Sequence, residues 1–342
     1  TLENATITEG DTYNGAAIYA PTGDLNIHLV DKNEIESTRN FMVVYASSGS
    51  IEITGQGMLT VESNDTCIWA GGGGVTVSGA TLNLTSTSSN GIYANNSNET
   101  ASIVIKDKAH VTIDASNFGM ACSGNLSILN STVIASASGD SSNVFYSWEG
   151  EVVISNSTVQ AKGTSDGAYP TIYAENGISI FANSNVIASS PNSNALFSPN
   201  TITVSDSVLE AKSTGWAVWS NSSIEISGST VKTYDTGGEY TNASLHAGTT
   251  LTVSNSSDVL ADGGIEALDG ITVTPANGKL VEYKAGVHEN GESGTKHRGN
   301  SPYDTEFSFS NDDIELGYTY VHIKDHVHTY GDEWSLDDTH HW

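Results

Sequence analysis

The sequence predicts an all-β solenoid, a single-stranded right-handed parallel β-helix of about eleven coils, and three observations lead to this prediction. Gly, Ser, Thr and Asn dominate the chain, and its Ile, Val and Leu residues occur in short alternating runs typical of strands. No stretch has the periodicity of a helix. A four-residue motif returns about every 25 residues, and such a fixed period is typical of stacked repeats.

The four-residue motif pairs an apolar second position with a small fourth position. Its copies begin at residues 17, 43, 67, 91, 119, 144, 171, 195, 217, 244 and 264, and they read AIYA, VVYA, CIWA, GIYA, GMAC, VFYS, TIYA, ALFS, AVWS, SLHA and GIEA. An alternating triplet such as VTV (75) and a third run such as STVIA (131) follow each motif. Three short strands in each repeat describe one coil of a solenoid.

Two related solenoids fit the sequence less well. A leucine-rich repeat needs a helical segment and an L-x-x-L-x-L frame, and the chain has neither. A left-handed hexapeptide helix would have more uniform coils. We expect a β-helix over residues 1–286 that starts in mid-coil, a linker with capping strands over 287–325, and a His- and Trp-rich tail over 326–342, which reads as a truncated surface repeat.

Because successive side chains of a strand alternate between its faces, what each motif position tolerates indicates where it points. The second position is always a large apolar residue and the fourth is Ala, Ser or Cys, so both are predicted to face the core. The third position is then predicted to face outward. Most of its residues are aromatic: Tyr19, Tyr45, Trp69, Tyr93, Ala121, Tyr146, Tyr173, Phe197, Trp219, His246 and Glu266.

Stacked coils would align these third-position residues, which we call the aromatic row, at the strand spacing of about 4.8 Å. Trp148, Tyr169, Trp216 and Tyr240 lie in nearby connecting segments. An exposed row of this length indicates a binding surface, unless its rings only stabilise one another as a ladder. The candidate carbohydrate-binding residues are Tyr19, Tyr45, Trp69, Tyr93, Tyr146, Trp148, Tyr173, Phe197, Trp216 and Trp219.

The charge of the chain excludes some classes of partner. Its net charge of −28, from 40 acidic and 12 basic residues, would repel nucleic acid and anionic membranes. The sequence contains no run of about 18 apolar residues, so it predicts no membrane-spanning segment. The two cysteines, Cys67 and Cys122, are expected to be free thiols.

Catalysis is expected to be absent. A polysaccharide lyase needs a basic residue, and Arg39 is the single arginine within the coils, since Arg298 lies beyond them. A glycoside hydrolase needs two carboxyl groups about 5 to 9.5 Å apart, and residues 1–286 contain neither Asp-Asp nor Asp-x-Asp. Either activity stays an alternative, because stacking can bring together carboxyl groups from different coils.

The last residues carry a candidate metal site. His326 and His328 form a His-x-His pair, and His340 and His341 are adjacent, which makes the four a candidate Zn²⁺ site. No cofactor is required by the predicted function. Ca²⁺ would assist if the bound glycan were acidic.

The coil pattern over roughly residues 17–286 resembles the right-handed parallel β-helix proteins of the pectate-lyase-like superfamily. The segments GQGMLTVES (55) and VTVSGATLNLTS (75) also resemble cell-surface proteins of gram-positive bacteria described as carbohydrate-binding. The resemblance implies an extracellular protein at the bacterial surface that binds a polysaccharide or a host or cell-surface glycan. An adhesin with a protein partner and a purely structural stalk remain the alternatives.

Overall fold

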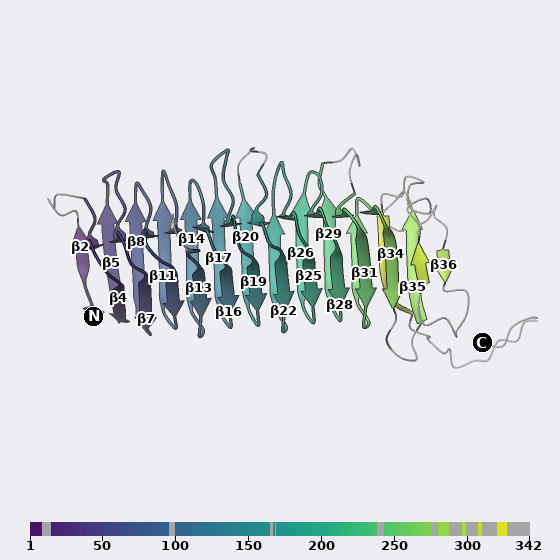
Figure 1. Ribbon diagram of the computed structural model, residues 1–342, viewed down its shortest axis with the longest axis horizontal. Coiled ribbons are helices and arrows are strands. Elements are labelled where there is room, and N and C mark those ends of the chain that lie inside the picture. The colour runs from purple at the N-terminus through teal and green to yellow at the C-terminus, as the bar shows by residue number, and fades with distance from the viewer. Residues whose placement is uncertain are drawn as a thin grey trace, which may run out of the picture.

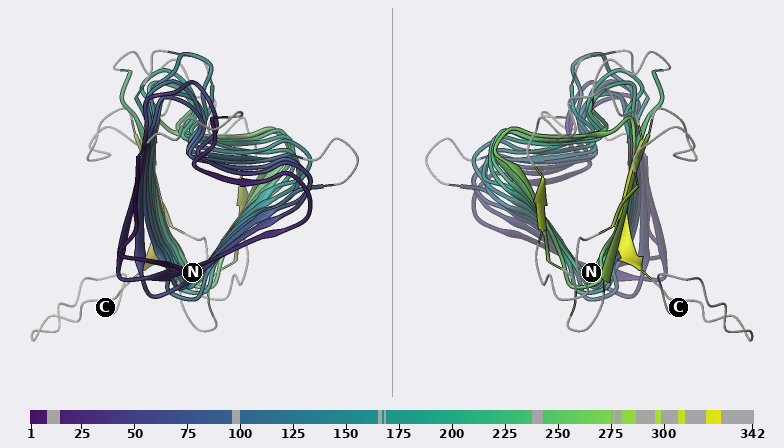
Figure 2. Two further views of the ribbon diagram at one scale, coloured as in Figure 1. Left: turned by 90° about the vertical axis from the view of Figure 1, so that its left-hand side faces the viewer. Right: turned by 90° about the vertical axis from the view of Figure 1, so that its right-hand side faces the viewer.

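Three β-sheets enclose one hydrophobic core in the computed structural model, which describes residues 1–8, 15–95, 100–164, 167, 169–237, 243–274, 276, 280–286, 296–298, 307–309 and 320–326. The coils follow one another from the N-terminus along the long axis of the molecule (Figure 1). Views along this axis show the three faces of a triangular cross-section (Figure 2). The described residues contain no helix, and the predicted all-β parallel solenoid is confirmed.

Each coil contributes one strand to sheet C, then one to sheet A and one to sheet B. Within the described residues sheet C has eleven strands, one from each copy of the motif: β3 (Ile18–Ala20), β6 (Val44–Ala46), β9 (Ile68–Ala70), β12 (Ile92–Ala94), β15 (Met120–Cys122), β18 (Phe145–Ser147), β21 (Ile172–Ala174), β24 (Leu196–Ser198), β27 (Val218–Ser220), β30 (Leu245–Ala247) and β33 (Ile265–Ala267).

Sheets A and B form the two longer faces. Sheet A consists of β1 (Leu2–Glu3), β4 (Leu25–Val30), β7 (Ile51–Gly55), β10 (Val75–Ser78), β13 (Ile103–Lys106), β16 (Leu126–Leu129), β19 (Val152–Ser155), β22 (Ile178–Phe181), β25 (Ile202–Ser205), β28 (Ile224–Ser227), β31 (Thr250–Ser254), β34 (Gly270–Thr274) and β37 (Phe307–Phe309). Sheet B consists, in spatial order, of β2 (Thr6–Thr8), β5 (Lys32–Ser37), β8 (Met58–Ser63), β11 (Thr81–Ser86), β14 (His110–Ala115), β17 (Thr132–Ala137), β20 (Thr158–Gly163), β23 (Asn185–Ser189), β26 (Val208–Ser213), β29 (Thr230–Asp235), β32 (Asp258–Asp262), β38 (Tyr320–His326), β35 (Leu280–Gly286) and β36 (Lys296–Arg298).

Equivalent residues of neighbouring coils lie opposite one another. Ile92 pairs with Ile68 on one side and with Met120 on the other, and the same register holds along sheet C. The second-position residues are buried apart from Ile18 at the N-terminal end, which is half-buried. The inward assignment of the second and fourth positions is therefore confirmed.

The corner between sheets A and B depends on residues that tolerate a left-handed backbone. Asn130, Asn156 and Asp206 have φ angles of 46°, 48° and 46°, a conformation that Asn and Asp adopt more readily than other non-glycine residues. A serine follows each of them and turns into the core. This corner is the physical reason for the recurring Asn-Ser pairs in the sequence.

The serines after this corner form a continuous buried ladder. Each backbone N–H donates a hydrogen bond to the hydroxyl of the equivalent serine in the next coil, and most of the hydroxyls donate in turn to backbone carbonyl groups. The N···Oγ distances are 3.1 Å from Ser131 to Ser157, 3.3 Å from Ser157 to Ser184, 3.1 Å from Ser184 to Ser207, 3.2 Å from Ser207 to Ser229 and 3.2 Å from Ser229 to Ser257.

Antiparallel strands follow the last coil. β38 pairs with β32 in sheet B, and β37 pairs with β34 in sheet A. His322 on β38 contacts Asp258 on β32 with an Nε2–Oδ1 distance of 2.7 Å. Through these pairings the two antiparallel strands occupy the sheet edges on which another parallel coil would stack.

The two cysteines are buried free thiols, as expected from the sequence. Burial raises the pKa of both thiols from the usual 9.0 to about 12, and the charge of Asp65 adds to the effect at Cys67. Among the described residues no helix is long and apolar enough to cross a membrane.

Removing one hydroxyl from the serine ladder should destabilise the fold. Ser184→Ala leaves the buried N–H of Ser157 without its acceptor, which should cost about 1 to 3 kcal/mol. Ser179→Ala, on the outer face of the same coil, should change the stability by less than about 0.5 kcal/mol. Equal urea midpoints for the two variants would contradict the role given to the ladder.

The thiols should be inert in the folded protein. At pH 8 both cysteines should react with a thiol reagent only after the protein is denatured, because burial favours the neutral thiol. The same shift makes the stability of the protein depend on pH. Because the folded-state pKa values of the thiols lie above the unfolded ones, the stability that the neutral buried thiols contribute is present below about pH 9 and is lost as the pH rises toward 12. Fast modification of the native protein would show that the thiols are accessible.

Candidate functional site

The aromatic row lies on the outer face of sheet C, as predicted. Its residues are half-buried or exposed, and Tyr19 at the N-terminal end is the most exposed ring with 39% of its surface accessible. Ala121 is the exception, because it is fully buried. The strand register places Tyr45 beside Trp69, Trp69 beside Tyr93, and Tyr146 beside Tyr173.

Neighbouring rings of the aromatic row contact one another. Centroid separations of 4.5 to 7 Å are favourable for tilted and stacked rings. The separations are 5.4 Å for Tyr19–Tyr45, 5.9 Å for Tyr45–Trp69, 5.3 Å for Trp69–Tyr93, 5.1 Å for Tyr146–Tyr173, 5.6 Å for Tyr173–Phe197, 4.8 Å for Phe197–Trp219 and 5.8 Å for Trp219–His246. The row is thus a ladder of mutually supporting rings as well as a surface.

Trp148 bridges the one gap in this ladder. Ala121 stands between Tyr93 and Tyr146 in the register and has no ring to offer. The Trp148 ring lies 6.0 Å from Tyr93 and 5.6 Å from Tyr146, so it connects the two halves of the row. The predicted proximity of Trp148 to the row is therefore observed.

Further rings come from the loops that lead from sheet B into sheet C. Phe118 stacks on Tyr146 with a centroid distance of 5.3 Å, and Trp216 lies 4.5 Å from Trp219. Phe41 contacts Tyr45 edge to face at 6.2 Å. Phe118 and Phe41 were not predicted to join the row, although Phe118 shares with Trp216 the position directly before the motif. Tyr169 is exposed, and Tyr240 lies outside the described residues.

His246 and Glu266 occupy the last two positions of the aromatic row. The ring centroids of His246 and Trp216 lie 5.5 Å apart. The Nδ1 atom of His246 lies 2.7 Å from the Oε2 atom of Glu266 in the next coil. The predicted outward direction of Glu266 agrees with this position, because its side chain is 44% exposed.

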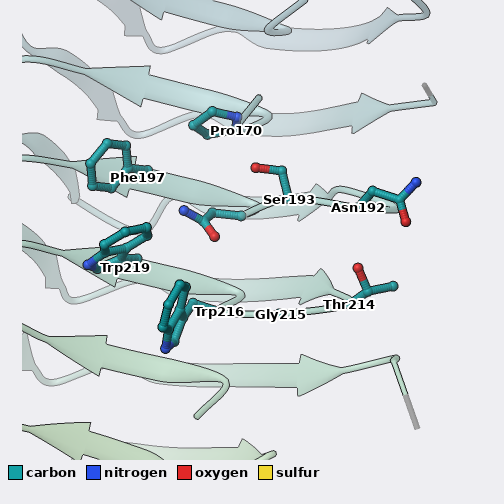
Figure 3. Close-up of a pocket in the computed structure, with 9 residues that line it drawn as sticks. Pro170, Asn192, Ser193, Phe197, Thr214, Gly215, Trp216 and Trp219 are labelled. Atoms are coloured by element: carbon teal, nitrogen blue, oxygen red, sulfur yellow. The ribbon is translucent and has the colours of Figure 1, made fainter. Parts of the chain in front are cut away.

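A pocket of about 390 Å³ opens beside Phe197, Trp216 and Trp219 (Figure 3). The three rings lie on one side of the pocket in this view, whereas Ser193, Asn192 and Thr214 lie on the other. Its remaining lining residues are Pro170, Asn194 and Gly215. The pocket therefore combines aromatic surface with amide and hydroxyl groups, and none of the described residues that line it is charged.

Two unsatisfied donors lie next to the pocket. The indole N–H groups of Trp216 and Trp219 are buried and have no hydrogen-bond acceptor among the described residues, and the same is true of Trp69. A buried donor without a partner costs about 1 to 3 kcal/mol. Unsatisfied donors of this kind call for an explanation, and a functional site is one of the recognised explanations.

Glu175 brings a carboxylate to the middle of the row. It accepts a hydrogen bond from the hydroxyl of Tyr173, which precedes it by two residues. Burial raises the pKa of Tyr173 and of Tyr146, and the charge of Glu175 raises both further. These tyrosines therefore stay neutral at physiological pH and present aromatic surface without charge.

The predicted zinc ligands cannot be placed. His328, His340 and His341 lie outside the described residues, as does the side chain of His326 at the end of β38. Within the described ranges no group of three His, Cys, Asp or Glu side chains is arranged to hold a metal ion.

Comparisons with known proteins add no family to this description, since no protein-family model, curated protein or solved structure matches the chain. The fold and the site together define a parallel β-solenoid with an exposed aromatic cluster on one sheet.

Loss of a ring from the middle of the ladder should destabilise the protein more than loss of a ring from its end. Tyr146 contacts the rings of Phe118, Trp148 and Tyr173, and each contact contributes about 0.5 to 1.5 kcal/mol. Tyr146→Ala should therefore lower the free energy of unfolding by about 1.5 to 4.5 kcal/mol.

Tyr19→Ala is the matched control, because among the described rings Tyr19 contacts Tyr45 alone. Its loss should cost about 0.5 to 1.5 kcal/mol. Chemical denaturation of both variants measures the difference, and equal losses would show that ring contacts contribute little to the stability.

Proposed function

We propose that the protein binds an extended polysaccharide along the aromatic row without modifying it, and that it does so at a bacterial cell surface or after secretion. The pocket beside Phe197, Trp216 and Trp219 is the observation that carries this proposal. Its mixture of aromatic, amide and hydroxyl groups matches the two kinds of surface that a sugar ring presents.

A pyranose ring has an apolar face of C–H groups and a rim of hydroxyl groups. Trp219 and Phe197 offer aromatic surface to the C–H face, while Asn192, Ser193 and Thr214 offer donors and acceptors to the rim. The volume of about 390 Å³ lies within the range of ligand sites, which is about 300 to 1,000 Å³. The pocket is therefore large enough for one sugar residue.

The ladder supports binding because it holds the rings in place before a ligand arrives. Trp219 contacts Phe197 at 4.8 Å and Trp216 at 4.5 Å, so its ring has little freedom to lose. Side chains that are already ordered lower the entropic cost of association. The regular spacing of the row also suits a polymer, whose successive units would meet successive coils.

A structural stalk is the second candidate, and the ring-to-ring contacts themselves favour it. In that case the ladder would serve stability alone and the pocket would stay empty. Adhesion to a protein partner, and cleavage by a lyase or a glycoside hydrolase, are further outcomes that the same experiments separate.

A glycan array, probed with and without Ca²⁺, should reveal binding to a polysaccharide. For the glycan found, Trp216→Ala and Trp219→Ala should each weaken binding by about 1 to 3 kcal/mol, by analogy with the stacking of bases on aromatic side chains. Phe181→Ala is the control, because Phe181 is an exposed ring on sheet A and lies away from the pocket.

Circular dichroism should confirm that each variant is folded before its affinity is compared. Unchanged affinity in both tryptophan variants would contradict the proposed site, and lowered stability without any binding would favour the stalk. Release of shortened or unsaturated sugar products would instead reveal an enzyme.

A further inference from the structure

Glu175 is a carboxylate placed among aromatic rings. It follows β21 directly, and its side chain accepts a hydrogen bond from the hydroxyl group of Tyr173. The ring of Tyr173 lies 5.1 Å from the ring of Tyr146 and 5.6 Å from the ring of Phe197, which lines the pocket. The strand that Glu175 follows, β21, pairs directly with β24, the strand that carries Phe197.

Within the part of the chain that the structure describes, no basic side chain pairs with the Glu175 carboxylate. From Tyr169 to Asp269, the described part of sheet C and of the loops at its edges contains no lysine or arginine. The nearby Lys212 belongs to sheet B, where it contacts Glu210 at 2.6 Å and lies over the ring of Tyr234.

A carboxylate beside aromatic faces is the combination that recognises an organic cation. Ring faces attract an ammonium group, and a carboxylate adds a charged hydrogen bond. The net charge of −28 extends this preference over a longer range, because it attracts cations and repels anions. The pocket lined by Phe197, Trp216 and Trp219 would hold another part of the glycan.

We propose that the site selects a glycan that carries free amino groups, with an ammonium group held at Glu175 beside Tyr146 and Tyr173. This inference rests on the proposed polysaccharide binding and names the class of sugar that the row accepts. Neutral glycans bind more weakly at the same place, and uronate polymers bind most weakly.

Three labelled oligosaccharides of equal length test this selection: a glucosamine oligomer, an N-acetylglucosamine oligomer and a uronic acid oligomer. Fluorescence polarisation at pH 6 and low salt gives the dissociation constant of each, because the amino groups are protonated there. The wild-type protein should bind the glucosamine oligomer about tenfold more tightly than the acetylated one.

Two matched variants locate the effect. Glu175→Gln keeps an acceptor for Tyr173 and removes the charge, so it should abolish most of the tenfold preference and leave the affinity for the acetylated oligomer unchanged. Glu225→Gln removes the same charge from the exposed face of sheet A and should keep the full preference.

The outcomes distinguish this inference from the proposal on which it rests. Equal affinity for the amino and acetylated oligomers, tighter binding of the uronate, or an equal effect of the two glutamine variants would overturn the selection at Glu175, while polysaccharide binding would stand. Failure of the protein to bind any glycan on the array would overturn both.

Discussion

The in-register stacking of parallel strands is the constraint on which the rest of this structure depends. Residues of the strands lie over their equivalents in the next coil at about 4.8 Å, so a residue type that recurs in the motif becomes a continuous row in space. One rule produces the apolar rows of the core, the serine ladder at the corner and the aromatic row outside. The hydrogen bonds of the serine ladder and the ring contacts of the aromatic row therefore both follow from the register of the strands.

The same constraint separates the scaffold from the parts that are free to vary. Strands must keep the register, and a missing ring at Ala121 is compensated by Trp148. The loops between sheets B and C lie outside the register, and they supply the side chains that turn a regular ladder into a pocket. Trp216 and Asn192 both come from such loops. The loops thus supply the side chains that differ from coil to coil, whereas the sheet supplies the side chains that repeat.

The alternation of side chains along the strands could be predicted from the sequence, whereas the serine ladder and the contacts made by loop residues could not. The burial of Ile172 and the outward direction of Tyr173 follow from the alternation of side chains and agree with the structure. The serine ladder was not foreseen, because Asn-Ser pairs describe a turn without showing that the Ser184 hydroxyl faces the core. The pocket and the contact between Phe118 and Tyr146 depend on loop conformations, which periodicity does not encode.

The register places the rings of sheet C in one line, and we propose that this line binds one extended ligand. A crystal structure of the protein with a bound oligosaccharide tests this most directly. We expect a sugar ring in the pocket against Phe197, Trp216 and Trp219, with the rest of the oligosaccharide following the aromatic row past Tyr173. An oligosaccharide bound on sheet A or sheet B, with the pocket empty, would contradict it.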